Sequence, residues 1–266
     1  MPEQTPVLSL DLTAGYSGKG DILRNIQLQI STGEIAGLVG ESGSGKSTLT
    51  LAVLQLLFLR NGYTKGSVRL NGKELVGLSE SELREIRGRD IGLVLQSPTS
   101  SLNPALKIGT QLYETWRAHK PGSRKECVPA FLELLRTLNL DADEKFLQRK
   151  PSQISVGQAQ RVLIAMAILH HPALVIADEP TSALDVITQK EVLGIFRQLA
   201  RERNIGILFV SHDLLAVSSL CDRIAILREG EIVESGPTAR VLGSPQHNYT
   251  KQLVSALPNV EFSSQH

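Results

Sequence analysis

The residues with the clearest chemistry in this sequence are the glycines, lysine and serine of a short loop. Residues 40–48 read Gly-Glu-Ser-Gly-Ser-Gly-Lys-Ser-Thr and match the spacing G-x-x-x-x-G-K-[ST]. Glycines let the backbone turn its N–H groups toward an anion, and a helix that begins near Lys46 directs the positive end of its dipole at the same point. The spacing therefore predicts a phosphate-binding loop, in which Lys46 reaches the β- and γ-phosphates of a nucleotide and Ser47 holds Mg²⁺.

The segments on either side of this loop match what such a loop requires. Residues 34–39 form a short apolar run that is typical of a buried strand, and residues 49–57 have the pattern of a largely buried helix. A glycine-rich turn without function would need neither of them. The predicted phosphate contacts are Gly40, Glu41, Ser42, Gly43, Ser44, Gly45, Lys46, Ser47 and Thr48.

A second cluster of chemical groups is the pair Asp178 and Glu179, which ends the apolar run that begins at residue 174. A strand over that run would carry both acids to its carboxyl end, where open α/β sheets bind ligands. There Asp178 could hold Mg²⁺, mostly through water, and Glu179 could polarise a water molecule that attacks a phosphate. Acid pairs on the surface after a strand are common, so the phosphate-binding loop upstream is what favours the functional interpretation.

The apolar pattern predicts an α/β protein with one antiparallel part. Residues 22–30 alternate between apolar and polar side chains, which indicates a strand with one solvated face, as in an antiparallel sheet. Residues 97–153 are helical with an exposed loop at 120–125, and the alternation of strands and helices on either side predicts a mostly parallel sheet covered on both faces. The expected strands are residues 7–12, 22–30, 34–39, 66–72, 91–95, 173–177, 205–210, 224–227 and 231–234, and the expected helices outside 97–153 are residues 49–57, 79–86, 158–169, 188–203 and 214–220.

Composition excludes several classes of protein. The 266 residues include 28 Lys and Arg against 27 Asp and Glu, and a formal net charge of +1 provides no basic excess for nucleic acid. Cys127 and Cys221 lie far apart, which indicates reduced thiols and neither a disulfide framework nor a zinc site. No apolar run approaches the ~18 residues of a membrane span, and the amino terminus lacks the pattern of a signal peptide. If this chain acts at a membrane, a partner must therefore hold it there.

The order of the motifs resembles the ATP-binding subunit of an ABC transporter, and the resemblance covers essentially the whole chain. Residues 40–48 resemble the Walker A motif, and residues 174–179 resemble Walker B. The other motifs are the Q-loop glutamine Gln96, the signature Ile-Ser-Val-Gly-Gln at 154–158, the D-loop at 182–185 and the switch histidine loop at 211–213. Each short motif is weak evidence alone, but their shared order is specific.

The resemblance implies a fold and a set of functional residues. The fold would be the α/β core of a P-loop NTPase of the RecA-like type, with a mostly parallel sheet, an antiparallel β subdomain and a helical subdomain. The cofactors would be ATP and Mg²⁺. The implied catalytic residues are Glu179, His212 and Gln96, and the implied metal ligands are Ser47, Gln96 and Asp178. The implied nucleotide contacts beyond the loop are Tyr16, Ser155, Gly157, Gln158 and Asp185.

Tyr16 has two possible interpretations, and Val156 departs from the family's pattern. Tyr16 would stack its ring on adenine, although beside Gly15 and Gly18 it could also be a turn tyrosine. In the signature, Val156 replaces the first of the family's two glycines, whereas Ser155 and Gly157 match. A valine resists positive φ and adds bulk, so we expect a slower site wherever this signature completes one.

The resemblance also implies a division of the chain. Residues 1–96 and 154–236 would form the nucleotide-binding core with its β subdomain, residues 97–153 the helical subdomain, and residues 237–266 a carboxyl-terminal extension, all within one ABC ATPase domain. Residues 96–104 and 244–250 resemble the matching segments of peptide and nickel importers, with Asn248 where those proteins usually have proline. An iron–sulfur cluster is not expected, because no cysteine follows Cys221.

The partners implied are membrane permease subunits, a second ATPase subunit that is either a paralogue or identical, and indirectly an external solute-binding protein. The location implied is the cytoplasmic face of the inner membrane, as a peripheral subunit without nucleic acid. A soluble ABC ATPase of DNA repair or translation is the alternative, although the Walker motifs are not separated by a coiled coil and the chain contains one ATPase unit. An inactive nucleotide-binding module is disfavoured because Glu179 and His212 are present.

Overall fold

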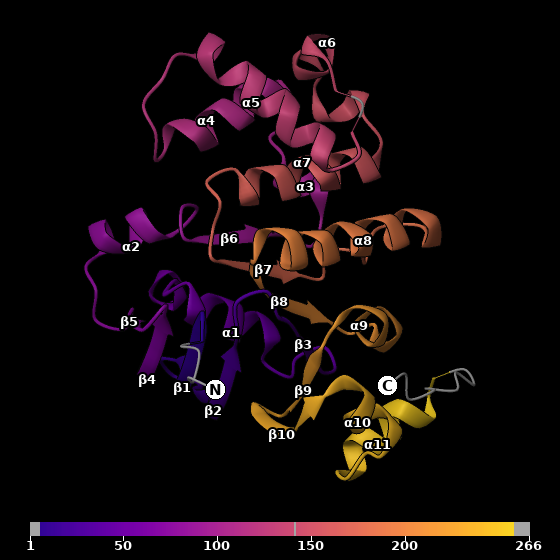
Figure 1. The fold of residues 1–266 in the computed structure, drawn as a ribbon. Coiled ribbons are helices and arrows are strands. Elements are labelled where there is room, and N and C mark those ends of the chain that lie inside the picture. Colours follow the sequence, from indigo (N-terminus) through magenta and orange to yellow (C-terminus); the bar gives the residue numbers. More distant parts are fainter. Residues whose placement is uncertain (1–5, 141, 258–266) are drawn as a thin grey trace. The chain divides into compact units, whose positions relative to one another are not determined.

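The fold described here is that of a computed structural model, which describes residues 6–140 and 142–257 (Figure 1). The chain divides into two compact units. The first contains Met1–Leu83 and Arg197–His266, and the second contains Arg84–Phe196. The division into core, helical subdomain and carboxyl-terminal extension stays a prediction.

The first unit contains the antiparallel sheet that the alternating pattern predicts. Its strands are β1 Leu8–Tyr16, β2 Gly20–Ile30, β4 Gly62–Leu70 and β5 Lys73–Glu74, in the order β2-β1-β4-β5. In β2, Ile26, Leu28 and Ile30 are buried, while the glutamines between them are exposed. The apolar residues thus face the core and the polar ones face water, as a period of two requires.

The same unit contains the central strand that carries the phosphate-binding loop. Strand β3 Ile35–Val39 lies between β8 Gly206–Ser211 and β9 Arg223–Arg228 and is parallel to both. Every residue of β3 and β8 is buried, as expected for central parallel strands. Strand β10 Glu231–Pro237 forms a hairpin with β9 across Glu229 and Gly230, which have φ of 49° and 83°. Positive φ at both turn residues suits a tight hairpin, so the predicted hairpin is confirmed.

The first helix of this unit ends sooner than the sequence pattern suggests. Helix α1, Lys46–Val53, begins at the loop and ends early, because Gln55 adopts a left-handed backbone with φ of 51° before the 3₁₀ turn Leu57–Arg60. The predicted capping box is present ahead of α2 Glu80–Ile86, where the Ser79 N–H donates to Glu82 at 2.9 Å. The other helices of the first unit are α9 Leu214–Leu220, α10 Thr238–Gly243 and α11 Asn248–Ser255. The two boundaries between the units fall inside α2 and inside the long helix α8 Val186–Arg203.

The second unit combines two parallel strands with a group of helices. Strand β6 Ile91–Val94 pairs with β7 Leu174–Asp178. The helices are α3 Pro98–Ser101, α4 Ile108–Arg117, α5 Arg124–Thr137, α6 Glu144–Gln148 and α7 Val156–Ile168, with a 3₁₀ turn at Pro151–Gln153. The helical character predicted for 97–153 is therefore confirmed. The exposed loop predicted at 120–125 ends sooner, because a capping box between Ser123 and Glu126 begins α5 inside it.

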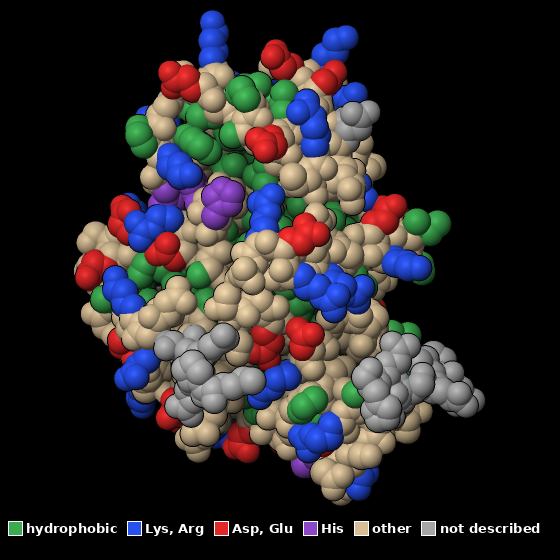
Figure 2. Space-filling model, in the orientation of Figure 1, with side chains coloured by type: hydrophobic (Ala, Val, Ile, Leu, Met, Phe, Trp, Pro, Cys, Tyr) green, Lys and Arg blue, Asp and Glu red, His purple; other side chains and the backbone are tan. Residues whose placement is uncertain are grey.

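The face of the molecule drawn in Figure 2 agrees with the balanced composition of the chain. Basic and acidic side chains alternate across the face drawn in Figure 2, without a large field of one sign. Within residues 6–140 and 142–257, no helix combines the length and the apolar character that crossing a membrane requires.

Candidate active site

The loop after β3 has the backbone that a phosphate-binding loop requires. Gly43 and Gly45 have φ of 83° and 114°, and Gly45 is the residue before the first turn of α1. A Cβ on Gly45 would lie 2.7 Å from Leu23 Cδ2, and one on Gly40 would lie 2.3 Å from the Leu227 carbonyl oxygen. Side chains at these positions would clash with their neighbours, so the spacing of glycines reflects a steric requirement of the folded loop.

Two polar side chains of this loop, Ser44 and Lys46, are buried. The Lys46 side chain is buried, and its ammonium donates hydrogen bonds to the carbonyl oxygens of Gly40 and Glu41 at 2.7 and 2.9 Å. The hydroxyl of Ser44 is buried without a hydrogen-bond partner within the protein. A buried hydroxyl without a partner is costly, and a phosphate oxygen in the loop would satisfy it. The residues present therefore fit a nucleotide phosphate.

Tyr16 lies beside the helix that begins at the loop. It is the last residue of β1, and its hydroxyl is 3.5 Å from Thr48 Oγ1 in the first turn of α1. The predicted adenine-stacking residue and the predicted phosphate contact Thr48 are thus neighbours in the first unit. Tyr16 therefore belongs to strand β1 rather than to the turn that follows it, and its stacking on adenine stays a prediction.

His212 follows the strand next to the one that carries the loop. Ser211, the last residue of β8, pairs with Val39, the last residue of β3, so His212 and Gly40 both follow the carboxyl ends of neighbouring parallel strands. The next residue, Asp213, caps α9 by accepting hydrogen bonds from the N–H groups of Leu215 and Ala216. His212 therefore sits in a turn fixed on both sides, and its side chain is exposed.

In the second unit, the two predicted residues Gln96 and Glu179 contact one another. Gln96 Nε2 donates a hydrogen bond of 2.9 Å to Glu179 Oε2, across 83 positions of sequence. The register of the two strands explains this contact, because Val94 of β6 pairs with Ala177 of β7. Gln96 and Glu179 each come just after the carboxyl end of one of these strands. Asp178 is the last residue of β7, and Glu179 has a positive φ of 48°, a conformation uncommon for residues other than glycine.

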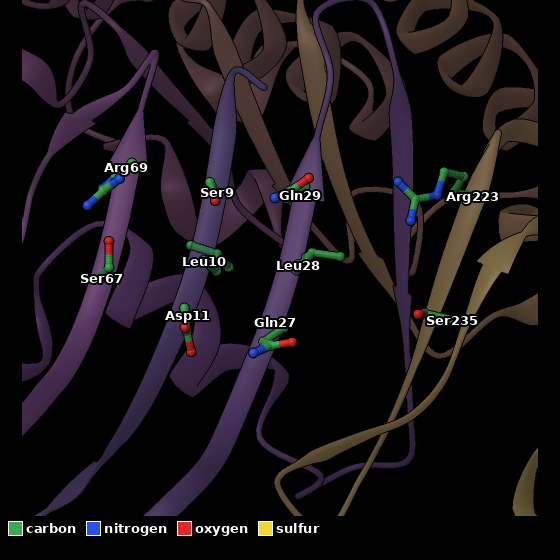
Figure 3. Close-up of a pocket in the computed structure, with 10 residues that line it drawn as sticks. All are labelled: Ser9, Leu10, Asp11, Gln27, Leu28, Gln29, Ser67, Arg69, Arg223 and Ser235. Atoms are coloured by element: carbon green, nitrogen blue, oxygen red, sulfur yellow. The ribbon is translucent and has the colours of Figure 1, made fainter. Parts of the chain in front are cut away.

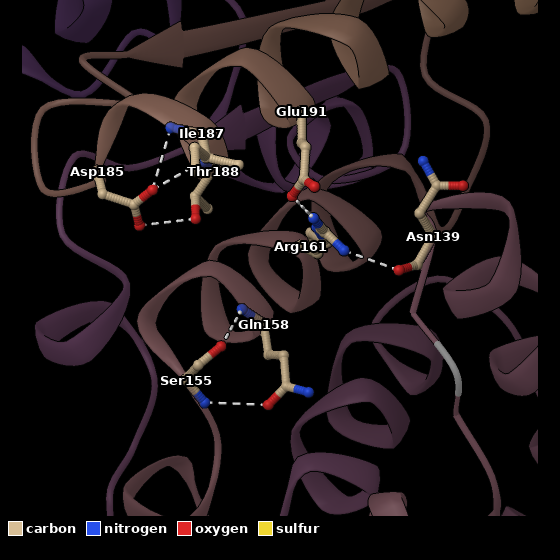
Figure 4. A network of polar contacts seen from close by, with 8 residues as sticks. All are labelled: Asn139, Ser155, Gln158, Arg161, Asp185, Ile187, Thr188 and Glu191. Carbon is tan, nitrogen blue, oxygen red and sulfur yellow. Dashed lines mark hydrogen bonds and ion pairs between the residues drawn. The ribbon is translucent and has the colours of Figure 1, made fainter.

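The signature residues form the beginning of helix α7 (Figure 4). The Ser155 hydroxyl accepts a hydrogen bond from the Gln158 N–H at 3.2 Å, and the Ser155 N–H donates to Gln158 Oε1 at 3.0 Å, which completes a capping box. Val156 is the first residue of α7, so its backbone is helical and the strain expected from a positive φ is absent. Its side chain is 41% exposed, and only its bulk remains as a departure from the family pattern.

The D-loop aspartate and the signature glycine are linked through Thr188. The Asp185 carboxylate accepts hydrogen bonds from the N–H groups of Ile187 and Thr188 and from the Thr188 hydroxyl at 2.8 Å (Figure 4). Hydrogen bonds from Thr188 hold the pKa of Asp185 below its ordinary value. A Cβ on Gly157 would lie 2.5 Å from Thr188 Cγ2, so only glycine fits there. The contact between Gly157 and Thr188 was missed from the sequence. The position of Asp185 directly before α8 was a signal only for its hydrogen bonds to the start of that helix.

The structure therefore brings the predicted residues together in two groups. The loop residues, Tyr16 and His212 belong to the first unit, and Gln96, Asp178, Glu179, Asp185 and the signature residues belong to the second. Their individual roles toward a nucleotide stay predictions. A smaller cavity of about 230 Å³ beside the loop was not foreseen, and it is lined by Glu41, Ser42, Gly43, Ser44, Arg228, Glu229, Tyr249 and Gln252.

A second cavity, away from the loop, contains none of the predicted residues. It is a groove of about 550 Å³ lined by strands β1, β2 and β4 together with Arg223 of β9 and Ser235 of β10 (Figure 3). Both of its arginines have carboxylate partners, since Arg223 lies 3.6 Å from Glu34 and Arg69 lies 3.4 Å from Glu74. Its polar side chains thus partly satisfy one another, and we assign the groove no role in nucleotide chemistry.

Comparison with known proteins places this arrangement in a family. Residues 23–182 match the family model described as ABC transporter. The chain belongs to the ABC transporter family. It is 38% identical over 251 residues to the oligopeptide transport ATP-binding protein OppD of Bacillus subtilis. The matched residues cover 94% of this chain and 70% of that protein. It is 40% identical over 245 residues to the probable D,D-dipeptide transport ATP-binding protein DdpD of Escherichia coli K12, covering 92% of this chain and 75% of that protein.

Solved structures of the family have the same fold. A dimeric ATP-binding cassette in a post-hydrolysis state, bound to ADP and Pi, superposes with a TM-score of 0.74 at 30% identity over 87% of this chain and 98% of that one. The protein cbiO1 of Clostridium perfringens, described as part of the ABC transporter complex cbiONQ, has a TM-score of 0.77 at 25% identity, over 90% and 92% of the two chains. The predicted family, the predicted fold class and an ATPase that drives transport are confirmed. A soluble ABC ATPase of repair or translation is not favoured.

Proposed function

We propose that this chain is the ATP-binding and hydrolysing subunit of an importer for peptides, nickel or a related small solute, with Mg²⁺ as cofactor. Two observations support the substrate class. The relatives OppD and DdpD are named for oligopeptide and D,D-dipeptide transport. The segments 96–104 and 244–250 resemble peptide and nickel importers. Permease subunits would carry the solute across the membrane.

The observation that carries the enzymatic part is the hydrogen bond between Gln96 and Glu179. At 2.9 Å, the Gln96 amide holds one carboxylate oxygen of Glu179. A carboxylate that receives a proton from water needs such orientation, because proton transfer depends first on geometry. The other oxygen of the same carboxylate has further lone pairs that can accept a hydrogen bond from a water molecule.

Residues of the first unit would bind the nucleotide. The loop N–H groups and the Lys46 ammonium would contact the β- and γ-phosphates, and the ring of Tyr16 would stack on adenine. Lys46 now donates to two loop carbonyls, so its ammonium is held within the loop and can turn toward phosphate at little entropic cost. His212 would donate a hydrogen bond to the oxygens of the γ-phosphate, where charge develops.

Residues of the second unit would support hydrolysis. Glu179 would accept a proton as water oxygen forms a bond to the γ-phosphorus and the bond to the bridging oxygen of ADP breaks, giving ADP and inorganic phosphate. Gln96 and Asp178 of this unit offer an amide oxygen and a carboxylate, and Ser47 of the first unit offers a hydroxyl. All three are oxygen donors of the kind Mg²⁺ takes. When bound, that ion would neutralise phosphate charge.

The signature would act on ATP held by a second ATPase subunit, identical or paralogous. Ser155 and Gly157 would contact that γ-phosphate with Gln158 beside them, and Asp185 would lie at the same subunit boundary. Closure of the two subunits around ATP would move permease subunits at the cytoplasmic face of the inner membrane, and an external solute-binding protein would deliver the substrate. Nucleic acid has no part in this proposal.

Co-purification from native membranes tests the transport assignment. The chain, tagged and solubilised in mild detergent, should bring down permease subunits and a second ATPase. Cysteine cross-links placed between Gln96 and Gln153 should reach a permease loop. Recovery with ribosomes or DNA and without membrane proteins, or cross-links confined to α11, would contradict the proposal.

A further inference from the structure

A carboxyl-terminal helix contacts the phosphate-binding loop through one hydroxyl group. Tyr249, the second residue of α11, accepts a hydrogen bond of 3.1 Å at its hydroxyl from the backbone N–H of Glu41. The two residues are 208 positions apart in the sequence and belong to the same unit. Tyr249 is only 4% exposed, so its hydroxyl competes little with water for this partner.

Several contacts fix the ring of Tyr249 and the backbone at the start of α11. The Tyr249 N–H donates to His247 Nδ1 at 3.1 Å, and the guanidinium of Arg228 lies 5.0 Å from the ring centre. The Glu234 carboxylate of β10 in turn accepts hydrogen bonds from the N–H groups of Gln246 and His247, each at 3.0 Å. Burial raises the pKa of Tyr249, so its hydroxyl stays neutral near pH 7. The hydroxyl is thus a fixed point for the loop.

The loop has a second attachment to the same part of the unit. The N–H of Gly230, in the turn between β9 and β10, donates to the Ser44 carbonyl oxygen at 3.0 Å. Glu41 and Ser44 are therefore both attached, and the segment between them contains Gly43 with its positive φ. A glycine-containing loop has many alternative conformations, and attachment at two points removes most of them.

We propose that Tyr249 is a positioning residue for ATP, because its hydroxyl holds the first half of the phosphate-binding loop in the conformation that receives phosphate. The Ser44 hydroxyl, buried without a partner, is aligned by the same two attachments. Ordering the loop before ATP arrives lowers the entropic cost of binding, which is the general effect of preorganisation. The inference rests on the proposed ATP binding and gives the carboxyl-terminal element a function there.

Removal of one hydroxyl tests the inference. Tyr249→Phe keeps the ring, its packing and the Arg228 contact while it deletes the acceptor for Glu41. A net hydrogen bond corresponds to about a 3- to 10-fold change in an equilibrium constant, so the Kd for Mg-ATP measured by calorimetry should rise by about that factor. Tyr113→Phe is a matched control, since the Tyr113 hydroxyl donates to the Gly122 carbonyl oxygen at 3.2 Å away from the loop. Its Kd should equal that of the wild type.

Hydrogen–deuterium exchange without nucleotide separates loop positioning from a general loss of structure. In Tyr249→Phe, peptides covering residues 40–44 should exchange faster, while α11 keeps its wild-type protection. Unchanged exchange in the loop, or an unchanged Kd, would overturn the inference, as would loss of protection throughout α11. Failure of the wild-type chain to bind Mg-ATP would instead contradict the proposed function, and the exchange measurement does not depend on that binding.

Discussion

Replacement of Glu179 by glutamine is the sharpest test of the hydrolysis chemistry. In the wild type, a Glu179 oxygen accepts from the Gln96 amide at 2.9 Å. The variant keeps an amide oxygen that can accept the same hydrogen bond, and it keeps the size of the side chain. What it loses is the ability to take a proton at neutral pH. We therefore expect ATP to bind normally and the chemical step to slow.

The expected size follows from the role of the group. Loss of a positioned general base typically slows a reaction by about 10²- to 10⁴-fold, which corresponds to about 3 to 5 kcal/mol of barrier. Phosphate release under single-turnover conditions reports the chemical step, and equilibrium titration reports Mg-ATP binding. Glu144→Gln is the matched control, because Glu144 is an exposed residue in the first turn of α6 and should leave turnover unchanged.

Two results would refute this reasoning. Wild-type turnover in Glu179→Gln would show that the carboxylate is not the base. A variant that no longer binds ATP would show that Glu179 acts on loop or fold rather than on the proton. Gln96→Ala provides a further check, since it removes the hydrogen bond from Gln96 but keeps the carboxylate of Glu179, and it should slow turnover less than Glu179→Gln does.

Three more predictions concern Lys46, Val156 and Glu234. Lys46→Ala removes a buried ammonium that faces the loop, and calorimetry should show at least about a 10-fold loss of Mg-ATP affinity, since charge-assisted hydrogen bonds are about twice as strong as neutral ones; unchanged affinity would contradict the loop assignment. Val156→Gly should raise steady-state hydrolysis because it removes exposed bulk from the signature, and a flat rate would show that the side chain points away from the nucleotide. Burial raises the pKa of Glu234, but hydrogen bonds from Gln246 and His247 outweigh burial and hold that pKa below its ordinary value. The ionised carboxylate therefore stabilises the folded state at a pH above the ordinary pKa of glutamate. This stabilisation is lost as the pH falls through the lowered pKa. Thermal melts between pH 7 and pH 3 should therefore show a larger acid loss for the wild type than for Glu234→Gln, and parallel curves would contradict this linkage.

The sequence alone determined the features that depend on neighbouring residues. The glycines of the loop, the strand before it and the helix after it follow from local backbone preferences and apolar periodicity. The hairpin across Glu229 and Gly230 and the capping box at Ser79 are local for the same reason. Helix ends were less exact, because α1 ends where Gln55 adopts a left-handed backbone that no local pattern announces.

Only the tertiary structure decided which distant residues meet. Gln96 and Glu179 contact one another because β6 and β7 pair in a particular register, and register is a property of two strands rather than of either one. Tyr249 reaches Glu41 across 208 positions because β10 and the short helix α10 lead the chain to α11, whose second residue contacts the loop. Local sequence states which residues are capable of chemistry. Strand pairing and packing, which depend on the whole chain, decide which of them are brought together to perform it.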